Sequence, residues 1–178
     1  MISRKTDTLV ILVIIAATLS SCSQNSSPPP LRLDDNLTFQ LIQNGSALEK
    51  KTLADFQDNW LLVNFWSVGC PPCFEEIPDL AKAHKLLDKP PLTVIGVAMS
   101  YDRPDSVLET TKRIKIPYPV SFDLDRKIEK AFGEITVIPS SFLVGPGGLP
   151  VKKYTGKVTF KQIEQELQQF SKTYQQKD

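Results

Sequence analysis

Residues 60–73 read WLLVNFWSVGCPPC, an apolar run that ends at Gly69 and is followed at once by two cysteines. A run so rich in aliphatic and aromatic residues is typical of a strand buried on both faces of a sheet. A helical apolar pattern follows, and proline is tolerated in the first turn of a helix, where its missing N–H would have no partner. We therefore predict that Cys70 lies where a buried strand leads into a helix. There the helix dipole favours ionisation of a thiol.

Two close cysteines can also be half of a zinc site or a structural disulfide. A zinc site needs two more ligands, and the remaining candidates are Cys22 and His84. Cys22 belongs to a targeting segment described below, and one histidine does not complete a tetrahedral site. A structural disulfide at this spacing closes too small a loop to constrain the unfolded chain much. Redox chemistry of Cys70 and Cys73 is therefore favoured, and we expect neither a metal nor a cofactor.

The motifs in this region resemble those of the thioredoxin superfamily. N-F-W-x-x-x-C-P-P-C at 64–73 is followed by E-x-P at 76–78 and, much later, by I-P-S-S-F-L-V at 138–144. From about residue 37 to 170 the chain is similar to the TlpA/ResA-like branch. These are membrane-anchored, extracytoplasmic thiol:disulfide oxidoreductases that often serve cytochrome c maturation. The resemblance implies an α/β thioredoxin-like fold, with a central mixed β-sheet flanked by helices and an N-terminal β-hairpin extension.

The expected reaction is thiol–disulfide exchange. Cys70 is the expected exposed nucleophile that attacks a partner's disulfide, and Cys73 is the buried thiol that then releases the reduced partner. The prolines at positions 71 and 72 remove two N–H groups, which leaves mainly the Cys73 N–H to stabilise a Cys70 thiolate. Fewer donors imply a higher thiol pKa and a more stable disulfide, so we predict a protein-disulfide reductase.

Glu76 is the third expected catalytic residue. In similar proteins a glutamate in C-x-x-C-x-x-E lies beside the thiols and assists proton transfer, and burial would raise its pKa. The alternative is an acidic residue that merely complements the helix N-terminus, as expected for Glu75. Trp66 is placed among the substrate-binding residues, although an aromatic side chain at a strand end is equally typical of a core. His84, on the apolar helix face, is expected to be a half-buried packing residue.

Pro139 matches the cis-proline of the family. It would lie against the two cysteines and expose the Ile138 backbone, so that both residues bind an extended substrate segment; the alternative is an ordinary trans loop proline. Gly133 lies six residues before Pro139, where related sequences usually leave five, and Val137 stands where glycine is common. We therefore expect the substrate loop to differ from that of related proteins.

The first 21 residues are predicted to be a signal peptide. Arg4 and Lys5 precede an apolar stretch at 9–19 that is too short to span a bilayer as a helix. The stretch ends in L-S-S-C, which resembles a bacterial lipobox, and in that pattern Cys22 is lipidated and becomes the first residue of the mature protein. The alternative is an ordinary signal peptide or uncleaved anchor with an incidental cysteine.

Residues 22–36 lack apolar periodicity and contain three consecutive prolines, which indicates a flexible, lipid-anchored tether. The thioredoxin-like domain is expected over 37–178. This organisation places the protein at the extracytoplasmic face of a membrane of the cell envelope. The 21 Lys and Arg against 20 Asp and Glu, without a basic run, give no indication of nucleic-acid binding.

Apolar segments that alternate with amphipathic ones predict parallel β–α–β crossovers in the domain. The expected strands are 37–42, 47–49, 61–65, 92–99, 141–144 and 150–154, the last antiparallel to its neighbour and near an edge. The expected helices are 52–57, 71–87, 104–114, 125–132 and 160–174. Pro78 should kink the second of these helices.

Three other functions are weighed against reduction of protein disulfides. A thiol peroxidase of the peroxiredoxin type would fit Ser67 three residues before Cys70, but Val63 stands where a proline is needed. A thioredoxin-like copper chaperone would want a distal histidine, and none follows His84. A redox-inert interaction module is disfavoured by two intact cysteines. The expected partners are a disulfide-containing protein substrate and a membrane or soluble thiol electron donor.

Overall fold

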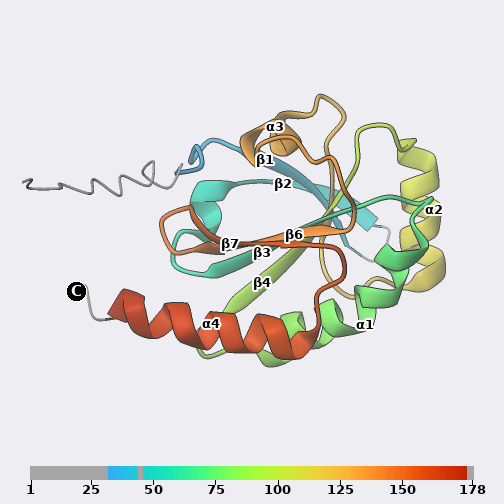
Figure 1. Cartoon of the computed structure of the whole chain (residues 1–178). Coiled ribbons are helices and arrows are strands. Elements are labelled where there is room, and N and C mark those ends of the chain that lie inside the picture. Colours follow the sequence, from blue (N-terminus) through green and yellow to red (C-terminus); the bar gives the residue numbers. More distant parts are fainter. Residues whose placement is uncertain (1–31, 44–45, 176–178) are drawn as a thin grey trace, which may run out of the picture.

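The computed structural model describes residues 32–43 and 46–175, which fold around one mixed seven-stranded sheet (Figure 1). The strands are β1 (Thr38–Gln43), β2 (Ser46–Thr52), β3 (Trp60–Trp66), β4 (Leu92–Ala98), β5 (Val120–Phe122), β6 (Ser140–Gly145) and β7 (Leu149–Thr155). Their order across the sheet is β2-β1-β5-β4-β3-β6-β7. The central pairs β3–β4 and β4–β5 are parallel, and the outer pairs are antiparallel. The predicted thioredoxin-like α/β fold with a mixed sheet is confirmed.

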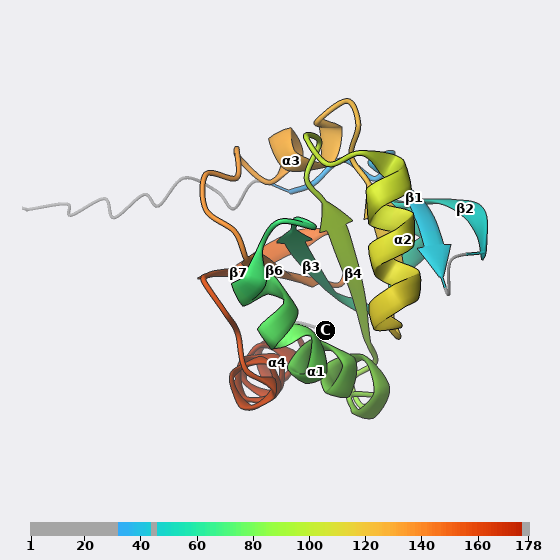
Figure 2. The same cartoon turned by 90° about the vertical axis from the view of Figure 1, so that its right-hand side faces the viewer.

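Helices lie on both faces of this sheet. They are α1 (Pro71–Leu86), α2 (Pro104–Ile114), α3 (Lys127–Ala131) and α4 (Phe160–Gln175). In Figure 1, α1 and α4 lie below the sheet and α3 lies above it, and Figure 2 shows α2 beside β4. An apolar cluster fills each side, so the molecule has one core layer under α1, α2 and α4 and a second under α3.

Strand β3 is an interior strand, between β4 and β6, and is buried along its whole length, as its apolar run predicts. Successive side chains of a strand point to opposite faces. Leu62 and Trp66 therefore belong to the cluster beside α1 and α4, whereas Leu61 and Val63 belong to the other cluster. The strand pairs in parallel with β4 and antiparallel with β6. The cysteine motif follows directly after its C-terminal end.

Most predicted elements are present, and two differ. The expected helix at 52–57 is a short 3-10 helix, Leu53–Phe56, because Asp55 accepts hydrogen bonds from Thr52 and closes a tight turn. The segment after Pro119, which is not among the strands predicted from the sequence, is strand β5, which is held between β1 and β4. The N-terminal hairpin is confirmed, and its second strand is longer than predicted.

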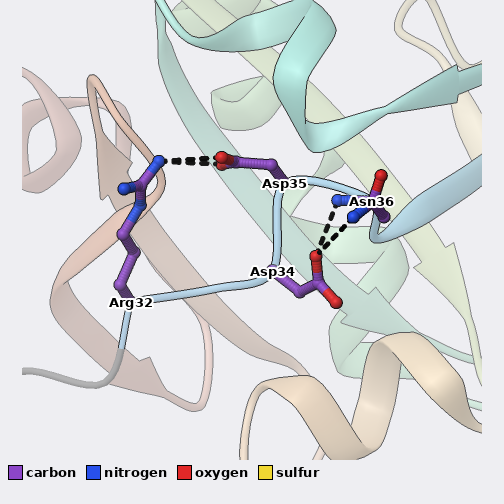
Figure 3. Close-up of polar contacts among 4 residues, drawn as sticks. All are labelled: Arg32, Asp34, Asp35 and Asn36. Atoms are coloured by element: carbon purple, nitrogen blue, oxygen red, sulfur yellow. Dashed lines mark hydrogen bonds and ion pairs between the residues drawn. The ribbon is translucent and has the colours of Figure 1, made fainter.

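The chain enters the domain through a short polar turn (Figure 3). The Arg32 guanidinium donates to both carboxylate oxygens of Asp35, at 3.0 and 2.9 Å, and Asp34 accepts from the main-chain and side-chain N–H groups of Asn36. Leu33 is buried, and its N–H donates to the main chain of the β6–β7 turn. The packed part of the chain therefore reaches back at least to Leu33, within the segment predicted to be a tether.

The predicted signal peptide, Cys22 and the tether as far as residue 31 lie outside the described residues. Within residues 32–43 and 46–175, no helix is long and apolar enough to cross a lipid bilayer.

Candidate active site

Cys70 and Cys73 form a disulfide at the start of α1. Cys70 is the N-cap residue of the helix, in extended backbone conformation, and the two prolines occupy the first helical positions. Its Sγ accepts a hydrogen bond of 3.3 Å from the Cys73 N–H, the donor that remains after both prolines. Cys70 is 6% exposed and Cys73 is 2% exposed, so in the disulfide form Cys70 is less open than the sequence predicts. Cys70 is nevertheless the more accessible of the two.

The loop between β3 and α1 is held by a buried carboxylate that the sequence did not reveal. Asp102, in the loop after β4, accepts hydrogen bonds of 2.9 Å from the Ser67 hydroxyl and the Val68 N–H. The Cys70 N–H in turn donates to the Ser67 carbonyl at 3.1 Å. In the sequence Asp102 looks only like the start of a helix, whereas in the fold it fixes the approach to Cys70.

Glu76, one turn beyond Cys73, is 1% exposed and is bound by two donors. Asn64 Nδ2 donates to Oε1 at 2.7 Å, and the Val158 N–H donates to Oε2 at 3.0 Å. Burial raises the pKa of Glu76 from 4.5 to about 7, against the opposing effect of these two hydrogen bonds. Such a group can hold or release a proton near neutral pH. Its neighbour Glu75, in contrast, is exposed and pairs with Lys157.

The peptide bond between Ile138 and Pro139 is cis, as the family resemblance predicts. Pro139 is buried, Ile138 is half-buried, and Val137 is 50% exposed. Among the described residues, no main-chain hydrogen bond involves Ile138, whereas the Pro139 carbonyl accepts one from the Gly156 N–H at 2.9 Å. Ile138 packs against both apolar clusters, and one of them contains both cysteines. The structure thus brings this loop to the cluster that holds the disulfide.

Trp66 lies inside the fold, whereas His84 is half-buried. Trp66 is 3% exposed, and its ring packs edge-on against Phe74 with 6.3 Å between centroids. A contact between Trp66 and substrate therefore stays a prediction, and in this conformation its indole belongs to the core. Burial lowers the pKa of His84, whose Nδ1 accepts a hydrogen bond from the Val94 N–H, as befits a neutral packing residue.

Within the part of the chain that the structure describes, no group of three or more His, Cys, Asp or Glu side chains is placed to hold a metal ion.

A mixed sheet, a C-x-x-C disulfide at the N-terminus of the first long helix and a cis-proline before β6 define a thioredoxin-like protein. The chain belongs to the AhpC/TSA family, whose model matches residues 35–149. It is 29% identical over 139 residues to the thiol-disulfide oxidoreductase ResA of Bacillus subtilis, covering 78% of this chain and 71% of that protein.

Solved structures show the same architecture. A thiol:disulfide interchange protein of the thioredoxin family from Chlorobium tepidum superposes with a TM-score of 0.62 at 25% identity, covering 75% of this chain and 93% of that one. StoA from Bacillus subtilis superposes with a TM-score of 0.61 at 21% identity, covering 73% and 96%, which shows the shared fold. The family, the fold and the Cys70–Cys73 pair make this chain an enzyme of the thiol-disulfide oxidoreductase class.

Proposed function

We propose that this enzyme reduces disulfides in partner proteins through the Cys70–Cys73 dithiol. The observation that carries the proposal is the pair itself, a disulfide at the N-terminus of α1 whose Cys70 sulfur has a single main-chain donor at 3.3 Å. A thiolate with one donor is less stabilised than one with several, so the disulfide form of the enzyme is favoured and the dithiol gives up its electrons readily.

The reaction has two thiol–disulfide exchange steps. The Cys70 thiolate attacks one sulfur of the partner's disulfide, which forms a mixed disulfide and releases the partner's other sulfur as a thiolate. Cys73 then attacks the Cys70 sulfur, which forms the Cys70–Cys73 bond and releases the second thiolate of the partner. The partner gains two electrons and the enzyme loses two. A thiol electron donor then restores the dithiol.

Glu76 supports the second exchange step, the attack of Cys73 on the Cys70 sulfur, as a proton acceptor. Cys73 attacks as a thiolate, so its proton must leave, and a buried carboxyl with a pKa of about 7 one turn away is suited to take it. Ile138 and Pro139 serve as the docking edge for an extended substrate segment. The support is the unpaired main chain of Ile138 beside the cluster that holds both cysteines.

The reductase assay tests the nucleophile. The purified domain, supplied with dithiothreitol, should reduce insulin disulfides, and Cys70→Ser should abolish this activity because no first attack is possible. Full activity of the serine variant would contradict the assignment. Turnover of hydrogen peroxide by the wild type, with insulin left intact, would favour the peroxidase alternative.

The resolving role of Cys73 is tested separately. Cys73→Ser should accumulate mixed disulfides through Cys70, since the first attack survives while the second is removed. Non-reducing gels and mass spectrometry would identify the captured proteins. If Cys70 proves reactive but captures no protein in the native host, a protein substrate is contradicted.

We further propose that the protein is a lipoprotein of the cell envelope, anchored through Cys22, and that its substrates include proteins of cytochrome c maturation. The L-S-S-C pattern after a basic and apolar leader supports the anchor, as does the cysteine left over from the redox pair. Mass spectrometry of the membrane-bound protein should show an acylated N-terminal Cys22. A soluble native species with unmodified Cys22 would contradict the anchor.

A further inference from the structure

Asn64 is the one polar residue of β3, whose other six residues are apolar. It is 2% exposed and lies directly opposite Ser141 in the register of β3 with β6. Its Nδ2 donates to Glu76 Oε1 at 2.7 Å and to Ser141 Oγ at 3.0 Å. A buried amide costs free energy unless it is hydrogen-bonded, and an apolar residue would suit the strand equally well. Packing alone therefore does not explain why an asparagine occupies this position.

The chemistry of an amide supplies that reason. A half-turn of the Asn64 amide places its carbonyl oxygen where its N–H group lay, so the same side chain can donate or accept at that point. Ionised Glu76 needs donors, whereas protonated Glu76 needs an acceptor for its O–H. The Ser141 hydroxyl can follow the change because it both donates and accepts. The Val158 N–H can only donate, so on its own it suits the ionised form of Glu76.

We propose that Asn64 is a positioning residue for thiol–disulfide exchange, which holds Glu76 one turn from Cys73 and reverses its amide as Glu76 gains and loses a proton. The proposal rests on the proposed function. When Cys73 attacks the Cys70 sulfur, its proton passes to the Glu76 carboxylate while the bond between Cys70 and the partner breaks. When the thiol donor reduces the Cys70–Cys73 bond, Glu76 returns the proton to the Cys73 thiolate.

Other charged groups also face Glu76. The charge of Asp79, on α1, raises the pKa of Glu76, and the charge of Lys157, between β7 and α4, lowers it. Tyr118, which precedes β5, is buried and stays neutral, with its own pKa raised by burial and by the Glu76 charge. None of these contacts involves Asn64. In the disulfide form Cys73 does not titrate, so the titration of Glu76 there contains no contribution from a Cys73 thiolate.

The first test is a carbon-13 NMR titration of the Glu76 carboxyl in oxidised protein. Asn64→Leu removes the amide contact from both protonation states of Glu76. The hydrogen bond to the ionised carboxylate is the stronger of the two, so its loss should raise the pKa of Glu76 by about one unit. Ser141→Ala is the matched control, because it removes the other contact of Asn64 and leaves the Glu76 contact in place; its titration should match the wild type. If the leucine variant does not fold, Asn64→Asp keeps the shape and should also raise the pKa, because two carboxylates then share the site.

The second test is the pH dependence of the resolving step, measured in a single turnover from a preformed mixed disulfide. The rate of the resolving step should rise with pH as Glu76 ionises. In the Asn64 variants the midpoint of this rise should move to higher pH by the same amount as the pKa from the NMR titration. An unchanged titration in the Asn64 variants overturns the proposal, and so does a shifted titration with an unchanged rate profile. Absence of insulin reduction by the wild type would instead overturn the proposed function, while the NMR comparison still decides whether Asn64 controls Glu76.

Discussion

Glu75 and Glu76 are neighbours in sequence with opposite surroundings. Glu75 is exposed and pairs with Lys157, whereas Glu76 is buried against Asn64 and the main chain of Val158. The charge of Glu75 therefore lies in water, and that of Glu76 lies in the core. The pH dependence of stability should reflect this difference.

Glu76→Gln should remove a pH-dependent loss of stability. The folded-state pKa of Glu76 is about 7 against an ordinary value of 4.5. The folded protein therefore binds the proton more tightly, and its free energy of unfolding falls as pH rises from the unfolded-state value through the folded-state value. The loss amounts to up to about 3 kcal/mol between pH 4.5 and 8. Urea unfolding of the oxidised protein across this range would measure it.

The matched control for that experiment is Glu75→Gln, which neutralises an exposed carboxylate one residue away. It should retain the pH slope of the wild type. An equal slope in wild type and Glu76→Gln would show that folding leaves the pKa of Glu76 at its ordinary value, and would contradict the raised pKa.

Sequence motifs predicted the residues closest to the sulfur chemistry, because C-x-x-C, the following glutamate and the later proline are local patterns. They did not reveal Asn64, Asp102 or Val158. Val158 binds Glu76 through its main-chain N–H and lies 82 positions away in the sequence. The identity of its side chain therefore gives no indication of this hydrogen bond. Asp102 meets the Ser67–Val68 turn from 34 positions away, and the contact exists only once β3 and β4 are paired.

Among the elements, α1 carries the redox pair and its first turn sets the environment of Cys70. Pro71 and Pro72 are exposed and occupy positions whose N–H groups would otherwise point toward the Cys70 sulfur. A helix N-terminus stabilises a thiolate through such groups and through its dipole. The two prolines thus reduce the stabilisation of the Cys70 thiolate by N–H groups and leave its stabilisation by the helix dipole in place.

Replacing Pro72 should make the couple less reducing. Pro72→Ala restores one N–H near the Cys70 sulfur, and Pro72→His adds a side chain that can be cationic. Both changes favour the thiolate, so the potential should rise by ~30 mV for each unit by which the Cys70 pKa falls, with the larger rise in the histidine variant. Pro78→Ala, inside α1 and away from the sulfurs, is the control. A lower potential in either Pro72 variant would contradict the argument.

Elements with strong periodicity were predicted well, whereas two short elements, β5 and the 3-10 helix, were not. The apolar run of β3 and the amphipathic pattern of α4 specify their elements locally. Strand β5 has three residues after a proline, too few for a pattern, and exists because β1 and β4 offer hydrogen bonds on both sides. The 3-10 helix after β2 likewise depends on the Asp55 side chain reaching back to Thr52.

At the scale of the whole molecule, the sheet brings distant segments to one end. The redox pair follows β3, the Asp102 loop follows the parallel neighbour β4, and the cis-proline precedes β6 on the other side of β3. In α/β sheets, sites form beyond the carboxyl ends of parallel strands, because the connecting loops meet there. One buried strand thus places the disulfide, its supporting carboxylate and the cis-proline loop together.

If the assembled site works as a reductant, the Cys70–Cys73 pair must have a low reduction potential. The wild-type domain would be equilibrated in dithiothreitol and glutathione buffers, and the disulfide fraction would be quantified by thiol alkylation. We predict a potential near that of thioredoxin, ~−270 mV. A potential above about −150 mV would place the protein with the strong oxidants, near ~−120 mV, and would contradict the reductase account.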